Sequence, residues 1–245
     1  GVQTCALPIW QNIRPGKCSC GLDVERPRVF CASVADVFED WGGPMVASNG
    51  IPLSKIDSRP WTVRVSDDEP TVTMGDVRNR LFSLIDQTPN LDWLLLTKRP
   101  ENIAKMMPKL TTNNVSQMSA AALDSGASCE EVDHVRPNVW LGTSVENQAA
   151  ADERVPKLLR CPGRLFLSCE PLLERVDLSR RGWLYSSGLR GRGRVIEWVI
   201  AGGESGPEAR ACNIEHLRSL RDQCREVWVP FFLKQLGARP VLASV

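Results

Sequence analysis

The chain has 245 residues, of which 42% are hydrophobic and 24% are charged, as is ordinary for a globular protein. Its formal net charge of +1 gives no overall attraction to nucleic acid or to a membrane surface, and no apolar run reaches the roughly 18 residues that a membrane-spanning helix needs. The nine cysteines are odd in number and mostly isolated, which favours a reducing, cytoplasmic setting over a disulfide framework.

The first nine residues, GVQTCALPI, read as the translation of a sequencing-library adaptor rather than as native protein. The alternative is a short genuine leader. The stretch is apolar like the core of a signal peptide, but no basic residue precedes it and no small-residue cleavage site follows it. We therefore expect residues 1–9 not to be native, the natural N-terminus to be lost, and residues 10–245 to form a single domain.

Short apolar runs recur along the chain, and each predicts a strand that is buried on both faces, as in a parallel sheet. The runs span residues 28–34, 93–98, 139–145, 165–171, 198–204 and 230–235. Amphipathic stripes between them predict helices over 76–88, 147–159 and 214–224, with Asn213 as the N-cap of the last. This alternation predicts an α/β fold, namely a parallel (β/α) barrel or partial barrel.

Two polar segments interrupt the alternation, and we expect both to be surface insertions. The first lies near residues 111–137 and carries an acidic cluster. The second lies near residues 175–194 and contains Arg175, Arg180, Arg181, Arg190, Arg192 and Arg194. These arginines predict either a solvated loop or a surface that neutralises several phosphates.

Charged residues and glycines follow the predicted strands at the same point. The carboxyl ends of parallel strands meet at one edge, where the sites of such folds are built. We predict catalytic roles for Lys98, Arg99, Glu146 and Glu170, and cofactor binding by Asp36, Gly202, Gly203, Glu204, Ser205 and Lys234. No metal ligands are predicted, because the histidines, His134 and His216, lie away from this edge and Cys18 and Cys20 are too isolated.

Several of these residues also have a purely structural interpretation. Glu146 suits the start of the helix at 147–159, where the helix dipole favours a carboxylate. The Lys-Arg-Pro stretch at 98–100 suits the start of another helix. The GGES stretch at 202–205 matches neither the dinucleotide fingerprint nor the phosphate-binding loop. Its glycines either let a polar ligand approach the backbone, with Glu204 binding a cationic or hydroxyl group, or only permit a tight turn.

A series of blocks along the chain resembles a phage-associated protein family of unknown function, whose members occur in phages, prophages and bacterial genomes. The blocks are VFCASVADVFEDW, NLDWLLLTKRPENI, NVWLGTSVENQAAADERVP, LFLSCEPLL, WVIAGGESGPEAR, SLRDQC and PFFLKQLG, and they cover roughly residues 28–237. Intact members of that family carry an N-terminal three-cysteine motif that resembles that of radical S-adenosylmethionine (radical-SAM) enzymes. The resemblance therefore implies a radical-SAM/TIM-like barrel, with a [4Fe–4S] cluster and S-adenosylmethionine in the intact parent.

No three cysteines of this chain have the close spacing of that motif, since its region contains only Cys18 and Cys20. The resemblance thus implies a truncated member that lacks the N-terminal strand and the cluster loop. We expect this chain to hold no cofactor and to be inactive. The phage setting implies that the parent enzyme acts on a nucleotide or nucleic acid. The alternative function is a non-catalytic module that binds phosphate or nucleic acid and has a degenerate barrel pocket.

Overall fold

The computed structural model describes residues 16–17, 23–24, 27–31, 36–47, 50–54, 62–63, 70–108, 136–179, 182–184 and 194–242. The expected adaptor segment and most of the two predicted insertions lie outside these residues, as do Cys18, Cys20 and His134. In the described part of the chain, no helix combines the length and the apolar character needed to cross a membrane.

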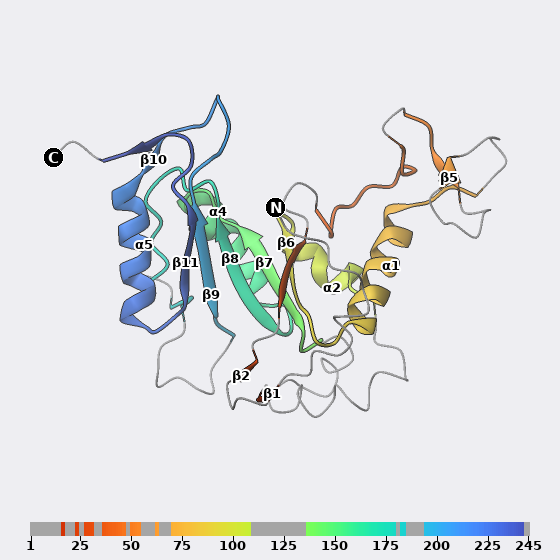
Figure 1. Ribbon diagram of the computed structural model, residues 1–245, viewed down its shortest axis with the longest axis horizontal. Coiled ribbons are helices and arrows are strands. Elements are labelled where there is room, and N and C mark those ends of the chain that lie inside the picture. Colours follow the sequence, from red (N-terminus) through yellow and green to blue (C-terminus); the bar gives the residue numbers. More distant parts are fainter. Residues whose placement is uncertain are drawn as a thin grey trace.

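A six-stranded, all-parallel sheet forms the centre of the molecule. Its strands are β3 (Arg28–Cys31), β6 (Asp92–Thr97), β7 (Val139–Ser144), β8 (Arg164–Cys169), β9 (Trp198–Gly202) and β11 (Phe231–Gln235). Their order in the sheet, β11-β9-β8-β7-β6-β3, follows the order of the chain. The sheet curls into a half-barrel (Figure 1), which confirms the predicted α/β class and partial barrel.

The remaining described strands form three small two-stranded sheets that the apolar pattern does not predict. They are β1 (Gly16–Lys17) with β2 (Asp23–Val24), β4 (Leu53–Ser54) with β5 (Thr62–Val63), and β10 (Cys212–Asn213) with β12 (Pro240–Val241). Each of these strands has two residues, so none is long enough to show a hydrophobic period.

Three longer helices accompany the sheet: α1 (Met74–Gln87), α4 (Gln148–Leu158) and α5 (Ile214–Glu226). The helix α1 begins two residues before its predicted start, because Thr73 and Asp76 form a capping box. Asn147 and the predicted Asn213 cap α4 and α5 with their side-chain oxygens. The short helices η2 (Pro100–Asn102) and α2 (Ile103–Met106) follow β6. The helix α5 flanks the β9–β11 edge, and α1 lies on the side of the opposite edge, beyond α2 (Figure 1).

The outward face of the sheet packs against the helices and forms the larger core. Alternate strand residues such as Leu95, Leu141 and Leu167 are buried there together with Phe82 of α1 and Leu220 of α5. Because side chains alternate along a strand, the residues between them face the inside of the curl. The runs look continuous in sequence because both faces of these strands are apolar.

The inward face is a smaller, mainly aromatic cluster. Its residues are Phe30, Leu94, Leu96, Trp140, Phe166, Trp198 and Ile200, and they come from five neighbouring strands. Phe166 fills the space beside Gly142, where an added Cβ would overlap its ring. At the amino ends of the strands, Arg28 lies over the Trp198 ring and Arg164 over the Trp140 ring, at 5.0 and 3.7 Å from the centroids. This end of the half-barrel is thus closed by stacked arginines and tryptophans.

Several described residues of both predicted insertions are buried. Val176, Leu178, Trp183 and Leu184 belong to the larger core, although they fall in the segment expected on the surface. Arg136, near the end of the other segment, is 3% exposed and forms a bidentate ion pair with Asp86. These residues therefore pack onto the core, because their apolar side chains and the Arg136–Asp86 pair outweigh the polar composition around them.

Candidate functional site

The predicted site residues lie at the carboxyl ends of the parallel strands. We call this edge the carboxyl rim; its residues are Asp36, 97–99, 144–146, 168–170, 202–205 and 234–235. The parallel register of all six strands brings these segments to the same end of the half-barrel. Lys98, Arg99, Glu170 and Glu204 therefore share one end, as expected, although each lies in a different ion pair.

Asp36 ties the segment after β3 to the end of β6. Its carboxylate accepts hydrogen bonds from the Thr97 hydroxyl at 2.6 Å, the Lys98 backbone N–H at 3.0 Å and the Arg99 guanidinium at 3.2 Å. It also accepts one from the Phe38 backbone N–H at 2.9 Å. These four bonds occupy both oxygens, so Asp36 positions the Lys-Arg pair. Cofactor binding by Asp36 stays a prediction.

Glu146 is the centre of a second cluster, at the end of β7. Its two carboxylate oxygens lie 3.0 Å from Lys98 Nζ and 2.9 Å from an Arg154 guanidinium nitrogen. Burial alone would raise the pKa of Glu146, but the hydrogen bond from Lys98 and the charges of Arg154 and Lys98 together lower it. Glu146 therefore stays ionised and holds two cations at the rim. Sequence reasoning missed Arg154, which lies two helical turns beyond Glu146.

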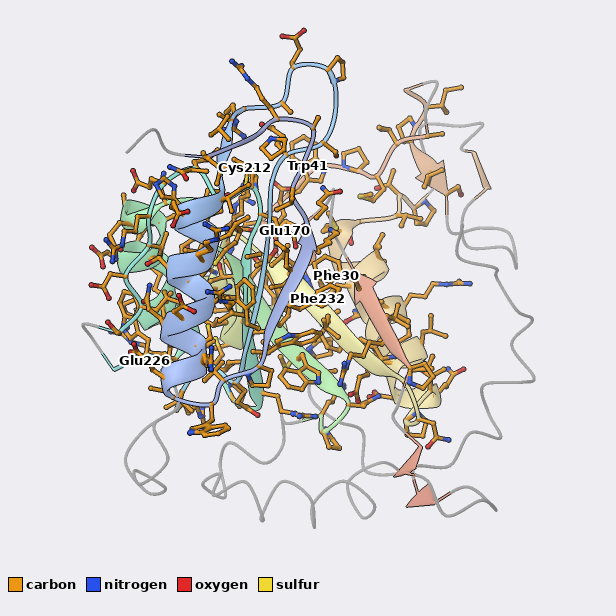
Figure 2. The ribbon with its side chains drawn as sticks, turned by 60° about the vertical axis from the view of Figure 1, so that its left-hand side comes forward. Phe30, Trp41, Glu170, Cys212, Glu226 and Phe232 are labelled. Atoms are coloured by element: carbon orange, nitrogen blue, oxygen red, sulfur yellow. The ribbon has the colours of Figure 1, made fainter. Side chains whose placement is uncertain are left out.

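Glu170 and Lys234 join β8 to the edge strand β11. Their charged atoms are 3.0 Å apart, and the Glu170 side chain is only 12% exposed. Lys234 Nζ also lies 5.5 Å from the ring centroid of Phe30, on the strand at the other edge of the sheet. Lys234 thus reaches from one edge strand of the half-barrel to an aromatic ring on the other. Figure 2 shows Glu170 above Phe30 and Phe232, towards the carboxyl ends.

Glu204 forms an ion pair with a residue of its own loop. Arg210 donates two guanidinium hydrogen bonds to its carboxylate, at 2.8 and 3.1 Å, and its backbone N–H donates a third at 3.0 Å. The side-chain hydrogen bond from Arg210 is the main reason that the pKa of Glu204 falls to about 2. The neighbouring Ser205 is exposed. Ligand binding by these two residues stays a prediction.

Gly202 and Gly203 let the chain after β11 approach the end of β9. A Cβ on Gly203 would overlap the Leu236 carbonyl, and one on Gly202 would lie 2.9 Å from the Gln235 carbonyl oxygen. The Gly203 N–H donates to that same Gln235 oxygen at 3.0 Å. The missing side chains therefore have a structural reason, which is the close contact between two strand ends. A bound ligand is a separate hypothesis.

Replacing Gly203 with alanine is expected to lower the free energy of unfolding by about 1–3 kcal/mol, since the new methyl group meets backbone that cannot swing away. The measurement is urea denaturation followed by circular dichroism. Gly42→Ala is the control, because nothing lies within 4 Å of a Cβ added at that position. A Gly203→Ala protein as stable as the control would show that the two strand ends are not in close contact.

The described residues do not offer a set of ligands for an iron–sulfur cluster. No three His, Cys, Asp or Glu side chains among them gather as a metal ion would require. Cys161, Cys169, Cys212 and Cys224 are buried and free. Burial raises the pKa of Cys161 to about 11 and that of Cys224 to about 12, which disfavours the thiolates that bind iron. The described rim side chains form ion pairs and hydrogen bonds.

A cavity of about 310 Å³ lies beside the loop that carries the Glu204–Arg210 pair. The segment after Glu204 borders it on one side and the segment after β11 on the other. Its lining residues are Gly206, Pro207, Glu208, Ala209, Ala238 and Arg239. It includes none of the predicted site residues, so the predicted site and the cavity do not coincide.

Together, the fold and the rim define a parallel α/β half-barrel protein with a belt of ion pairs at the carboxyl ends of its strands. The chain belongs to the family described as "Protein of unknown function (DUF5131)", whose model matches residues 65–243. No curated protein and no solved structure matches the chain. The match confirms the predicted membership of an uncharacterised family.

Proposed function

We propose that this chain is the half-barrel body of a radical-SAM-like iron–sulfur enzyme of phage or prophage origin, and that it binds a nucleotide or nucleic acid at the carboxyl rim. The sequence blocks that resemble the phage-associated family support the class. The sequential, parallel half-barrel supports the location, because folds of this kind bind substrates at the carboxyl ends of their strands.

In this proposal the cluster and S-adenosylmethionine belong to the intact parent, and when bound there they would supply the radical chemistry. The described residues of this chain do not fit the cluster. Their part is to bind and orient the substrate. Lys98, Arg154 and Lys234 would attract its phosphate, and Glu170 would accept a hydrogen bond from it.

The observation that carries the proposal is the Glu170–Lys234 pair on the inward side of the rim. Phe232 pairs in register with the inward residue Ile200, and the strand then bulges between Leu233 and Gln235. The Lys234 side chain reaches the inward side, because its Nζ lies 5.5 Å from the ring centroid of the inward residue Phe30. Ser168, which precedes Glu170 by two residues, pairs with Ile200 from the other side. A carboxylate and an ammonium group side by side suit a ligand that has both a hydrogen-bond donor and a phosphate.

The test is the affinity of the purified chain for cytidine and adenosine 5′-monophosphates, measured by isothermal titration calorimetry. Glu170→Gln and Lys234→Met are each expected to raise Kd by roughly 10- to 100-fold, because each removes a charge-assisted hydrogen bond to the ligand. Glu215→Gln is the control, since Glu215 lies on α5 in an exposed ion pair with Arg218, and it should leave Kd unchanged. The proposal is wrong if neither nucleotide binds, or if both rim variants bind like the wild type.

The alternative, a phosphate-binding module built on the segment 175–194, has less support from the described arginines. Arg175 donates to the Ser219 hydroxyl, and Arg194 donates to the carbonyl of Cys161 at 2.6 Å. Both therefore serve internal contacts. Arg180, Arg181, Arg190 and Arg192 lie outside the described residues. Single-stranded DNA binding that falls steeply with salt and survives Lys234→Met would favour this alternative.

A further inference from the structure

We infer that the open side of the half-barrel binds a nucleobase, which stacks on Phe232 and presents its polar edge to Glu170 and Lys234. The inference rests on the proposed function and names the part of the ligand that this site recognises. Two aromatic side chains, Phe30 and Phe232, lie on the inward faces of the two edge strands.

Phe232 is an inward-facing aromatic residue without the burial that such a position usually has. Its register partner Ile200 is 4% exposed, whereas Phe232 itself is 52% exposed. The strand β11 is the last in the sheet, so among the described strands none continues the sheet beyond it. A large flat ring is therefore available to a ligand on the inside of the curl.

Phe30 lies on the opposite edge strand and is held in place from both sides. The Phe30 ring meets the Phe166 ring edge-on, with 6.2 Å between the two centroids. Lys234 Nζ lies 5.5 Å from the centroid of the Phe30 ring. The contact with Lys234 shows that the two edge strands approach each other across the opening. Figure 2 shows Phe30 and Phe232 together below Glu170. The opening is thus bordered by aromatic rings and capped by an ion pair.

The positions of Phe232 and Lys234 suit a base. Both belong to β11, and although the strand bulges between Leu233 and Gln235, the Lys234 ammonium lies on the inward side, beside Phe30 and Glu170. A base stacked on Phe232 can therefore reach Lys234 and its partner Glu170 with its Watson–Crick edge. Cytosine and adenine both carry an amino group beside a ring nitrogen, which matches a carboxylate acceptor beside an ammonium donor. Base stacking on aromatic side chains is a common mode of nucleic-acid binding.

The test separates the base from the sugar phosphate by comparing cytidine 5′-monophosphate with ribose 5-phosphate in isothermal titration calorimetry. Phe232→Leu, which keeps an apolar side chain but removes the ring, is expected to raise Kd for cytidine 5′-monophosphate about 10-fold. It should leave Kd for ribose 5-phosphate unchanged. Phe232→Tyr keeps the ring and should retain wild-type affinity. Trp228→Leu is the control, because Trp228 is an exposed aromatic residue just before the same strand.

The outcomes distinguish this inference from the function on which it rests. If Lys234→Met weakens nucleotide binding but Phe232→Leu does not, the stacking site is wrong and the rim proposal stands. If the wild-type chain binds neither cytidine 5′-monophosphate nor ribose 5-phosphate, the proposed function is wrong and the inference falls with it. Circular dichroism of each variant establishes that a lost affinity does not reflect unfolding.

Discussion

Phe166→Ala is expected to lower the free energy of unfolding by about 3–5 kcal/mol, as is typical when a large buried aromatic residue is truncated. Phe166 is fully buried at the centre of the inward cluster. Its ring touches Phe30 and Trp198, with centroid distances of 6.2 and 6.4 Å. The loss removes contacts with strands on both sides of the half-barrel, and the curled sheet cannot collapse far enough to fill the space.

Urea denaturation monitored by tryptophan fluorescence gives this free energy, since Trp140 and Trp198 lie in the same cluster. Phe232→Ala is the matched control, because Phe232 is the same residue type on the same face but is half exposed. Its cost should be at most about 1 kcal/mol, given how little apolar surface it buries. Equal losses for the two variants would contradict the packed interior of the half-barrel.

Arg136→Met is expected to cost about 3–5 kcal/mol, because it leaves a partly buried carboxylate without its partner. The Arg136 side chain is 1% exposed, and it donates to both Asp86 oxygens, at 2.7 and 3.1 Å. It also donates to the Pro108 carbonyl at 2.9 Å and lies over the Phe82 ring. One guanidinium group therefore joins the residues before β7 to α1 and to Pro108, which lies just after α2.

The control for this prediction is Arg218→Met on α5, which removes an exposed ion pair with Glu215. Such surface pairs contribute about 0–1 kcal/mol, so the control should melt close to the wild type. The double variant Arg136→Met/Asp86→Leu should recover part of the loss, since it leaves no unpaired charge. An Arg136→Met protein with the stability of the Arg218→Met protein would show that Arg136 is not buried in solution.

The sequence predicts the six strands and three longer helices well, for one physical reason. A strand that is buried on both faces appears in the sequence as a continuous apolar run, and an amphipathic helix appears as a regular apolar stripe. A single sequence therefore shows both patterns. The ends of α4 and α5 follow from Asn147 and Asn213, whose side chains prefer the capping position. The start of α1 lies two residues before its apolar stripe, because the capping box of Thr73 and Asp76 sets it.

The rim could be predicted as a set of residues but not as a set of contacts. Which cation meets which carboxylate depends on strand adjacency and on the curl of the sheet, and neither is written locally in the sequence. Lys234 meets Glu170, which is 64 positions earlier in the chain, only because β11 and β8 flank β9. An ion pair between residues close in sequence is easier to predict, as for Arg210, which follows Glu204 within one loop. Nothing in the sequence predicts the burial of Arg136, because the segment that precedes it is polar.

The fit between Gly142 and Phe166 also constrains how this sequence can change over time. Any side chain at position 142 would occupy the space of the Phe166 ring. A smaller residue at 166 must therefore precede or accompany a larger one at 142, and the two positions form a coupled pair across the neighbouring strands β7 and β8. Family members that carry alanine at the first position are expected to have lost the phenyl ring at the second, so the shape of the interior should be inherited as a unit.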